Sequence, residues 1–340
     1  MLSFECDYNN GCLPEILEAL QTSNDCAEPG YGFDSFTEKA KKKIRDILEA
    51  DNAEIYFLAG GTQTNLVAIS SVLDSFEGVV AAETAHVATH ESGAIEYTGH
   101  KVLTLPSHNG KIDAGELESY LQQFYSNPTK EHTVFPGMVY ISSPTELGTL
   151  YSKKELEAIH AVTKAYDMKL YLDGARLGYG LMSKENDICF SDLKNLVDLF
   201  YIGGTKVGAL FGEALVFPNG DAPKQMFTRI KQHGALLAKG RAVAVQFDTL
   251  FTDNLYLKVS GHAIDLAEKL KEKLKKQGIR FYMETSTNQQ FVILENSELE
   301  KLSGYCRVDV WDVFDENHTV VRFCTSWSTK ETDIDMLFSN

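Results

Sequence analysis

Short apolar runs alternate with amphipathic stretches along the first two thirds of the chain. The runs AEIYFLAG, VVAAE, KVLTLP, GMVYIS, KLYLD and LFYIG have the length and composition of β-strands. The stretches between them include LVAISSVLDSF, GELESYLQQFY and SKKELEAIHAVTKAY, which we predict to be helices. Because strands alternate with helices, the chain predicts an α/β fold with a mostly parallel sheet.

The residues around these runs predict further helices. Pro14 suits the first turn of a helix over PEILEALQ, and the segment from Phe36 to Leu48 follows helical spacing. The stretch TAHVATHESGAIEY, residues 84–97, is predicted to be one helix. Residues 1–10 are polar and predict an irregular arm.

After about Phe217 the pattern changes. Two long helical stretches, residues 224–237 and 241–277, come first. The runs QFVILE, RVDVWDVF and TVVRFC then predict strands, and TKETDIDMLF predicts a closing helix. We therefore predict a large domain over residues 1–254, which includes the arm, and a smaller C-terminal α+β domain over residues 255–340.

Two of the predicted strands end in residues with complementary chemistry. KLYLD ends on Asp173, and LFYI leads through two glycines and a threonine to Lys206. Ligands of an open parallel sheet lie beyond the carboxyl ends of the strands, so both side chains are expected on one rim. A pyridine-aldehyde cofactor needs an acid for its ring nitrogen and an amine for its aldehyde. Taken singly, Asp173 is also consistent with a helix cap and Lys206 with a solvated surface lysine.

The stretch GGTQTN follows a predicted strand and opens a predicted helix. Backbone N–H groups at a helix N-terminus favour an anion, which would suit a phosphate group. The stretch matches neither the P-loop nor GxGxxG, and alone it is typical of a tight strand-to-helix turn. The phosphate hypothesis gains weight because Asp173 and Lys206 belong to the same sheet.

His86 and His90 lie four residues apart, which is metal-ligand spacing on a helix. No third ligand of the HExxH kind follows, so we expect no metal centre. A flat imidazole could instead stack on a flat cofactor or lie half-buried in the core. Glu91 either orients a histidine or forms part of a solvated helix surface.

Two arginines are candidates for binding a carboxylate with the planar guanidinium group. Arg176 follows Asp173 by about one turn, and Arg322 lies among apolar residues of a predicted strand. A structural ion pair is the alternative for each of them.

Composition narrows the possible partners. The 340 residues are 44% hydrophobic and 24% charged, with a net charge of −16, as in an ordinary globular protein of acidic character. No basic stripe is present, which argues against nucleic acid or an anionic membrane as a partner. The six cysteines form no CxxC pair and the first residues do not resemble a signal peptide, so we expect a cytoplasmic protein with reduced thiols.

The motifs YGFDSFT, GGTQTN, ETAHVATHESGA, LYLDGARLG and GGTK together resemble the threonine aldolase and β-eliminating lyase group of fold-type-I pyridoxal-phosphate enzymes. The resemblance spans nearly the whole chain, from CDYNNG to VVRFCTSWS. It implies the fold-type-I architecture, with a mostly parallel large-domain sheet, and pyridoxal 5′-phosphate as the cofactor. It also implies a homodimer or homotetramer with active sites at the subunit interface.

The resemblance further implies roles for individual residues. Lys206 would hold the cofactor aldehyde, Asp173 its ring nitrogen and His86 its ring face. Gly61, Thr62 and Thr205 would hold the phosphate. Arg176 and Arg322 would bind the substrate carboxylate, and Tyr31 would reach the site of a neighbouring subunit.

The sequence departs from low-specificity threonine aldolases in places that bear on the substrate. An SDT segment of those enzymes corresponds here to Cys6, Asp7 and Tyr8, which makes Cys6 a candidate substrate contact. Glu146, in PTELG, stands where they carry a histidine near the substrate hydroxyl. TELGT and HGALLAKGR make the chain more similar to the branch that includes phenylserine aldolases.

The expected reaction is aldol cleavage of a β-hydroxy-L-amino acid, of the threonine, allo-threonine or phenylserine type, to glycine and an aldehyde. The candidate bases for the β-hydroxyl proton are His86, His90 and Glu146. β-Elimination or transamination on the same cofactor is the alternative within enzymes. A non-catalytic α/β binding protein is the alternative from another class.

Overall fold

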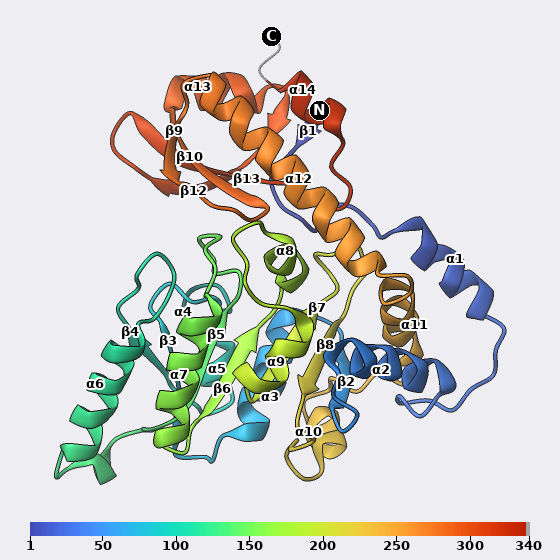
Figure 1. Cartoon of the computed structure of the whole chain (residues 1–340), viewed down its shortest axis with the longest axis vertical. Coiled ribbons are helices and arrows are strands. Elements are labelled where there is room, and N and C mark those ends of the chain that lie inside the picture. Colours follow the sequence, from blue (N-terminus) through green and yellow to red (C-terminus); the bar gives the residue numbers. More distant parts are fainter. Residues whose placement is uncertain (338–340) are drawn as a thin grey trace.

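A computed structural model describes residues 1–337 and contains a large sheet and a small sheet, one above the other in Figure 1. The large sheet has seven strands in the order β2-β8-β7-β6-β5-β3-β4, and every neighbouring pair is parallel except the two that involve β8. The strands are β2 (Glu54–Leu58), β3 (Glu77–Ala82), β4 (Val102–Leu105), β5 (Phe135–Ser142), β6 (Lys169–Asp173), β7 (Leu199–Gly203) and β8 (Glu213–Phe217). The predicted mostly parallel sheet is confirmed.

The small sheet has four antiparallel strands in the order β12-β13-β10-β9. They are β9 (Arg280–Met283), β10 (Gln289–Glu295), β12 (Asp309–Val313) and β13 (His318–Cys324). The N-terminal arm is more regular than predicted, because β1 (Leu2–Ser3) pairs with β11 (Cys306–Arg307) and Phe4 is buried in the same apolar cluster as Phe323. The arm therefore packs with the C-terminal part of the chain, and the division at residue 254 stays a prediction.

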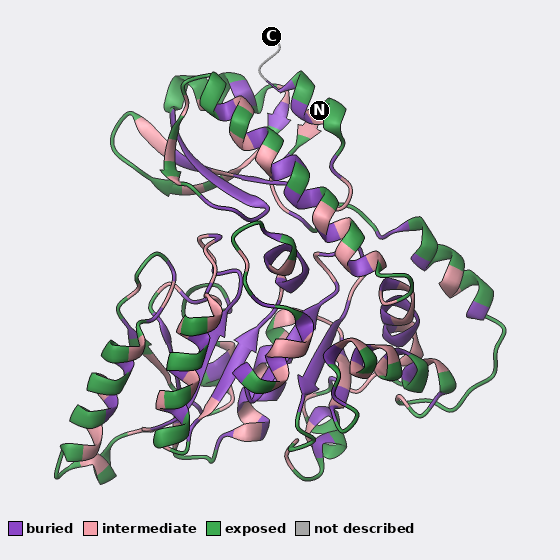
Figure 2. Ribbon diagram, in the orientation of Figure 1, coloured by how far each residue is buried: buried purple, intermediate pink, exposed green. Residues whose placement is uncertain are grey.

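Helices cover both sheets. They are α1 (Pro14–Ser23), α2 (Ser35–Leu48), α3 (Gly61–Val72), α4 (His86–Thr89), α5 (Ala94–Tyr97), α6 (Ala114–Ser126), α7 (Lys153–Ala165), α8 (Leu177–Met182), α9 (Leu193–Leu196), α10 (Met226–Gln232), α11 (Arg241–Leu250), α12 (Leu255–Lys276), α13 (Asn296–Ser303) and α14 (Glu331–Met336), with short 3₁₀ turns η1 (Lys130–His132) and η2 (Phe190–Asp192). Figure 2 shows that their outer faces are exposed, while the strands of the large sheet are buried. None of the helices within residues 1–337 is long and apolar enough to cross a membrane.

Local chemistry explains where several helices begin. Ser152 accepts a hydrogen bond from the backbone of Glu155, and the Glu155 carboxylate accepts one from the backbone of Ser152 at 2.7 Å. This capping box satisfies two N–H groups that a helix start leaves unpaired. Asp34 caps α2 in a similar way by accepting from the Thr37 backbone at 2.8 Å.

Two predicted helices are interrupted. Residues 84–97 form α4 and α5 instead of one helix, because Ser92 and Gly93 between them have positive φ angles of 52° and 71°. The predicted helix over residues 241–277 is likewise divided into α11 and α12, with Asp253 and Asn254 in the left-handed region. Left-handed residues cannot continue a right-handed helix, and neither break carries a proline that would have signalled it.

Candidate active site

Two adjoining cavities lie where the strands of the large sheet end and face the small sheet. The inner cavity, of about 310 Å³, is lined by the GGT turn after β2, by Asp173 at the end of β6 and by Lys206 after β7. The outer cavity, of about 530 Å³, lies between Glu146, which follows β5, and Trp311 and Arg322 of the small sheet. His86, Glu146, Arg176 and Lys206 line both cavities. The expectation that Asp173 and Lys206 share one rim is therefore consistent with this geometry.

Asp173 is buried, with 4% of its surface exposed, and both carboxylate oxygens have donors. Oδ2 accepts hydrogen bonds from the Tyr140 hydroxyl at 2.6 Å and from Asn65 Nδ2 at 3.0 Å, and Oδ1 accepts one from the Ala175 backbone at 2.9 Å. Three donors fix the orientation of the carboxylate and compensate for its burial. A rigid acid at the cavity wall suits a positively charged ring nitrogen.

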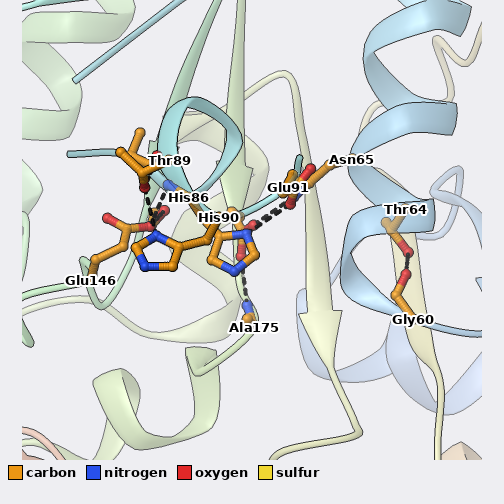
Figure 3. A network of polar contacts seen from close by, with 12 residues as sticks. Gly60, Thr64, Asn65, His86, Thr89, His90, Glu91, Glu146 and Ala175 are labelled. Atoms are coloured by element: carbon orange, nitrogen blue, oxygen red, sulfur yellow. Dashed lines mark hydrogen bonds and ion pairs between the residues drawn. The ribbon is translucent and has the colours of Figure 1, made fainter. Parts of the chain in front are cut away.

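His86 is fixed by Glu91, as Figure 3 shows. The His86 Nδ1 atom lies 2.8 Å from Glu91 Oε1, and the same oxygen accepts a hydrogen bond from Asn65 Nδ2 at 2.7 Å. Burial alone would lower the pKa of His86, but the hydrogen bond to Glu91 and the charge of Asp173 raise it above its ordinary value. The side chain of Glu91 is fully buried and contacts His86, so it does not belong to a solvated helix surface and instead orients the histidine.

The same view shows His90 beside His86. The two rings are stacked with centroids 5.8 Å apart, and the His90 ring is in turn stacked on Trp311 at 6.1 Å. His90 lines the outer cavity and is absent from the lining of the inner one. The three rings form a row that leads from the inner cavity towards the small sheet.

Lys206 follows β7 on a turn that is held at several points. Its backbone carbonyl accepts a hydrogen bond from the Tyr179 hydroxyl at 2.6 Å, and the Tyr8 ring lies 5.9 Å from its Nζ atom. Burial lowers the pKa of Lys206 and the charge of Arg176 lowers it further, although nearby carboxylates act in the opposite direction. A lowered pKa increases the neutral fraction of the amine, which is the nucleophilic form.

The turn from Gly60 to Thr62 forms the other end of the inner cavity. A Cβ atom at Gly60 would meet nothing within 4 Å, whereas one at Gly61 would lie 3.2 Å from the Tyr201 hydroxyl. Gly61 and Thr62 are the first two residues of α3, a helix of 12 residues, so their N–H groups belong to its first turn, where they lack partners within the helix. Thr205 lines the same end, but its hydroxyl donates to Glu213 at 2.8 Å and accepts from the Gly212 backbone at 3.0 Å.

Glu146 lies between the two cavities. Its Oε1 atom accepts hydrogen bonds from the Ser142 hydroxyl at 2.7 Å and from the His86 backbone at 3.0 Å. Burial raises the pKa of Glu146, against these hydrogen bonds, and the charge of Asp173 raises it further. Such a carboxylate can exchange a proton nearer to neutral pH than an ordinary glutamate.

The two predicted carboxylate-binding arginines already have partners. Arg176 donates from Nε to Asp7 Oδ2 at 2.7 Å and from Nη2 to Asp7 Oδ1 at 3.0 Å. Arg322 donates to Gln289 at 2.9 Å, lies 2.7 Å from Asp309 Oδ2 and stacks over the Trp311 ring at 5.0 Å. Arg176 still lines both cavities and Arg322 lines the outer one, and the Nε atom of Arg322 is buried with no hydrogen-bond partner among residues 1–337.

Two predicted substrate contacts lie apart from this cluster. Cys6 donates to Asn9 Oδ1 at 2.7 Å, and it lines neither the inner nor the outer cavity, whereas its neighbour Tyr8 lines both. Tyr31 lies against Lys231 and lines a separate cavity of about 210 Å³. Their proposed contacts with substrate and with a second subunit stay predictions.

The prediction overlooked residues whose partners are distant in sequence. They are Asn65, Tyr140, Asp7 and Glu213. Asn65 donates to both Glu91 and Asp173 and so joins them. Asn65 closes the GGTQTN motif, and Asp7 belongs to the segment matched to SDT, so both had a sequence signal. Tyr140 and Glu213 lie on strands and carry no motif of their own.

The donor set around the inner cavity fits pyridoxal 5′-phosphate. A fixed acid faces an amine whose pKa is lowered, an imidazole is held beside them, and open space lies at Gly60 before a helix N-terminus. These are the groups that an aromatic aldehyde with a phosphate arm requires. Glu213 is the exception, since it adds a buried acid to the end of the cavity that suits an anion.

Comparisons with known proteins agree with this chemistry. Residues 13–297 match the family described as beta-eliminating lyase. The low-specificity L-threonine aldolase of a Pseudomonas species is 30% identical over 335 residues, which cover 97% of this chain and 94% of that protein. The structure of Leishmania major threonine aldolase has a TM-score of 0.95 and 41% identity, and covers 99% of this chain and 98% of that one.

A more distant structure, of SPT with PLP, has a TM-score of 0.71 at 15% identity and covers 98% of this chain and 84% of that one. This likeness concerns the fold alone. Together with the closer relatives, it confirms the predicted fold-type-I architecture.

Proposed function

This chain belongs to the beta-eliminating lyase family, and from that premise we propose that it cleaves β-hydroxy-L-amino acids to glycine and an aldehyde with pyridoxal 5′-phosphate. It is a carbon–carbon lyase of the threonine aldolase type. The observation that carries the proposal is that the fixed carboxylate of Asp173 and the amine of Lys206 line one cavity. When bound, the cofactor supplies the electron sink for cleavage of the Cα–Cβ bond.

Each end of the cofactor has residues suited to hold it. Asp173 would pair with the ring nitrogen, Lys206 with the aldehyde, and His86 would cover the ring face. Gly61 and Thr62 would hold the phosphate through backbone N–H groups, with Thr205 beside them. Support comes from the common lining of the inner cavity by these six residues.

The substrate carboxylate would be bound by arginine. Asp7 occupies Nε and Nη2 of Arg176, which leaves Nη1 for a ligand. Arg322 would contribute from the small sheet, where it lines the outer cavity. A carboxylate held between the two arginines would fix the orientation of the Cα–Cβ bond.

Among the candidate bases, Glu146 has the best combination of position and pKa. A base must be ionised before it can take the β-hydroxyl proton, and Glu146 becomes ionised as the pH rises through its raised pKa. His86 has a raised pKa and so stays protonated to higher pH, which favours a donor. His90 lies behind His86 and lines the outer cavity only. We therefore assign proton removal to Glu146, directly or through a water.

The outer cavity favours a substrate with an aryl side chain. Its wall includes the flat ring of Trp311, which is held edge-on by Phe291 at 5.1 Å, and the ring of His90. Aromatic groups gain from offset or edge contacts with such rings. Phenylserine-type substrates would place their ring there, whereas threonine would leave the cavity largely filled with water.

A second subunit and a cytoplasmic location complete the proposal. Tyr31, Phe33 and Phe227 are exposed on one side of the large domain, with 41%, 68% and 41% of their surfaces accessible. Exposed aromatic groups that lie together are typical of protein interfaces. This supports a homodimer or homotetramer, and the free state of all six cysteines is consistent with a reducing compartment.

The direct experiment is a product assay. Purified protein is incubated with pyridoxal 5′-phosphate and either L-threonine or L-phenylserine, and glycine and the aldehyde are measured together. We expect equal amounts of the two products. Pyruvate and ammonia in place of glycine would show β-elimination, and no glycine from any β-hydroxy amino acid would reject the aldolase assignment.

A further inference from the structure

A buried carboxyl group at the phosphate end of the inner cavity has no place in the reaction described above. Glu213 opens β8, which runs between β2 and β7, and pairs in register with Leu58 just before the GGT turn. Only 4% of its surface is exposed, and it lines the cavity together with Thr62 and Thr205. An acid at this point faces the site where a phosphate dianion would bind.

Glu213 is also the centre of the turn that carries Lys206. Its Oε2 atom accepts a hydrogen bond from the Gly204 backbone at 2.9 Å, and Oε1 accepts one from the Thr205 hydroxyl at 2.8 Å. The Thr205 hydroxyl accepts in turn from the Gly212 backbone at 3.0 Å. The carboxyl group thus ties the two residues that precede Lys206 to the start of β8.

We propose that Glu213 is a positioning residue for Lys206 that takes up a proton when a phosphate-bearing cofactor binds. The group would then be neutral beside the phosphate while it keeps the turn in place. The inference rests on the proposed function, because it requires that a phosphate ester binds at the GGT turn.

The charges around Glu213 determine how the proton is gained. Burial raises the pKa of Glu213 to about 7, although the hydrogen bonds from Thr205 and Gly204 and the charge of Lys206 oppose the change. Among the neighbouring titratable groups, the charge of Lys206 lowers the pKa of Glu213 and the charge of Asp173 raises it. The charge of Glu213 in turn raises the pKa of Tyr171, Tyr201 and Tyr256. A phosphate ester carries nearly two negative charges at neutral pH, so its arrival favours the neutral acid.

Protonation of Glu213 would also act on Lys206. The negative charge of Glu213 is one of the influences that raise the pKa of the amine. When the solvent supplies a proton to the carboxylate, that influence disappears. Proton uptake by Glu213 would therefore offset part of the rise in the pKa of Lys206 that the phosphate charge itself causes, and so keep more of the neutral, nucleophilic amine.

The test uses a ligand that cannot react with Lys206. Binding of pyridoxine 5′-phosphate, which lacks the aldehyde, is measured between pH 7.0 and 8.5 on the apo protein by calorimetry, with pyridoxine as the phosphate-free reference. If Glu213 must be neutral in the complex, the affinity for the phosphate ester falls about fifteenfold over this range. The ratio of the affinities for the two ligands cancels the pH effects of protein groups that contact the ring, because both ligands carry the same ring. An equal pH dependence for both would overturn the inference.

Glu213→Gln is the informative variant. A glutamine can still accept from Gly204 with its oxygen while its amide donates to Thr205, so the turn keeps both contacts. We expect E213Q to bind pyridoxine 5′-phosphate with nearly the same affinity at both pH values. Glu54→Gln, at the other end of the neighbouring strand β2, is the matched control, since Glu54 also accepts from a hydroxyl, that of Tyr56 at 2.8 Å. An E213Q protein with the wild-type pH dependence would refute the role of Glu213.

The wild-type protein provides an independent measurement. Titrations at pH 8 in two buffers with different ionisation enthalpies give the number of protons taken up on binding, for which we expect about one. Zero uptake would contradict the proposal whether or not the variant folds. Failure to bind the phosphate ester or pyridoxal 5′-phosphate at any pH would instead count against the proposed function.

Discussion

Replacing Asp7 by asparagine should destabilise the protein strongly, although the two side chains have nearly the same shape, because the replacement removes a buried negative charge. The Asp7 side chain is fully buried, and the Arg176 side chain is 12% exposed. Both oxygens of Asp7 face the guanidinium group, and Oδ2 also accepts from Asn288 at 2.9 Å. Asparagine would leave the buried guanidinium charge without a counter-charge. Removing one partner of such a pair costs about 3–5 kcal/mol, which lowers the melting temperature by roughly 5–15 °C in a chain of this size.

Urea unfolding followed by circular dichroism measures this loss on the apo protein. Asp192→Asn is the matched control, because the Lys153–Asp192 pair has a similar separation of 2.7 Å but side chains that are 41% and 23% exposed. An exposed pair contributes only about 0–1 kcal/mol. The reasoning would be wrong if the two variants lost the same free energy of unfolding.

The pH dependence gives a second check. Burial alone would raise the pKa of Asp7, but the charges of Arg176 and Lys206 and the hydrogen bonds lower it overall. A depressed pKa means that the stabilisation is complete above the ordinary aspartate pKa of about 4 and disappears as the pH falls through the lower folded value. The wild-type advantage over D7N should therefore be constant from pH 5 to 8 and shrink under acid conditions. In an Arg176→Met background, D7N should lower the free energy of unfolding much less, because the guanidinium charge that D7N leaves unpaired is no longer present.

Four further changes test the site. Lys206→Ala should give a colourless protein without a borohydride-fixable cofactor linkage, and retention of the linkage would exclude Lys206 as the attachment point. Glu146→Gln should lower kcat about 10²–10⁴-fold and remove the rise of kcat with pH that the raised pKa predicts. Glu91→Gln should lower the pKa of His86 in an NMR titration, because the hydrogen bond and charge that raise it are lost, and an unchanged value would contradict that cause. Trp311→Leu should reduce kcat/KM for phenylserine about 3- to 10-fold more than for threonine, and equal losses would remove Trp311 from the aryl site.

Local sequence was sufficient to predict the rim that joins Asp173 and Lys206. Asp173 ends one short apolar run and Lys206 follows the end of another by three residues, and parallel strands present their carboxyl ends on one side, so the rule needs no knowledge of strand order. The helix breaks were not predictable in the same way. Asp253 and Asn254 lie in the left-handed region within a stretch of helical spacing, where the packing of α11 against α1 and α2 decides the geometry.

Contacts between distant residues account for the other omissions. Asp7 and Arg176 are separated by 169 positions, so no local pattern could pair them. Strand β8 is the antiparallel insertion in the large sheet, and its first residue, Glu213, reaches the cavity only because β8 lies between β2 and β7. The alternation of strands and helices gave no indication of such an insertion, which explains why a carboxyl group at the phosphate end was overlooked.

The polar chain through the site gives Glu146 a defined place where the resemblance to low-specificity threonine aldolases implies a histidine. Hydrogen-bond donors separate the buried acids: Asn65 lies between Asp173 and Glu91, and the His86 imidazole and backbone lie between Glu91 and Glu146. The three carboxylates are joined through these donors and not directly, so no proton is shared between two of them. A residue that must give and take a proton near neutral pH gains from that arrangement, because the charge of Asp173 raises the pKa of Glu146 across the network.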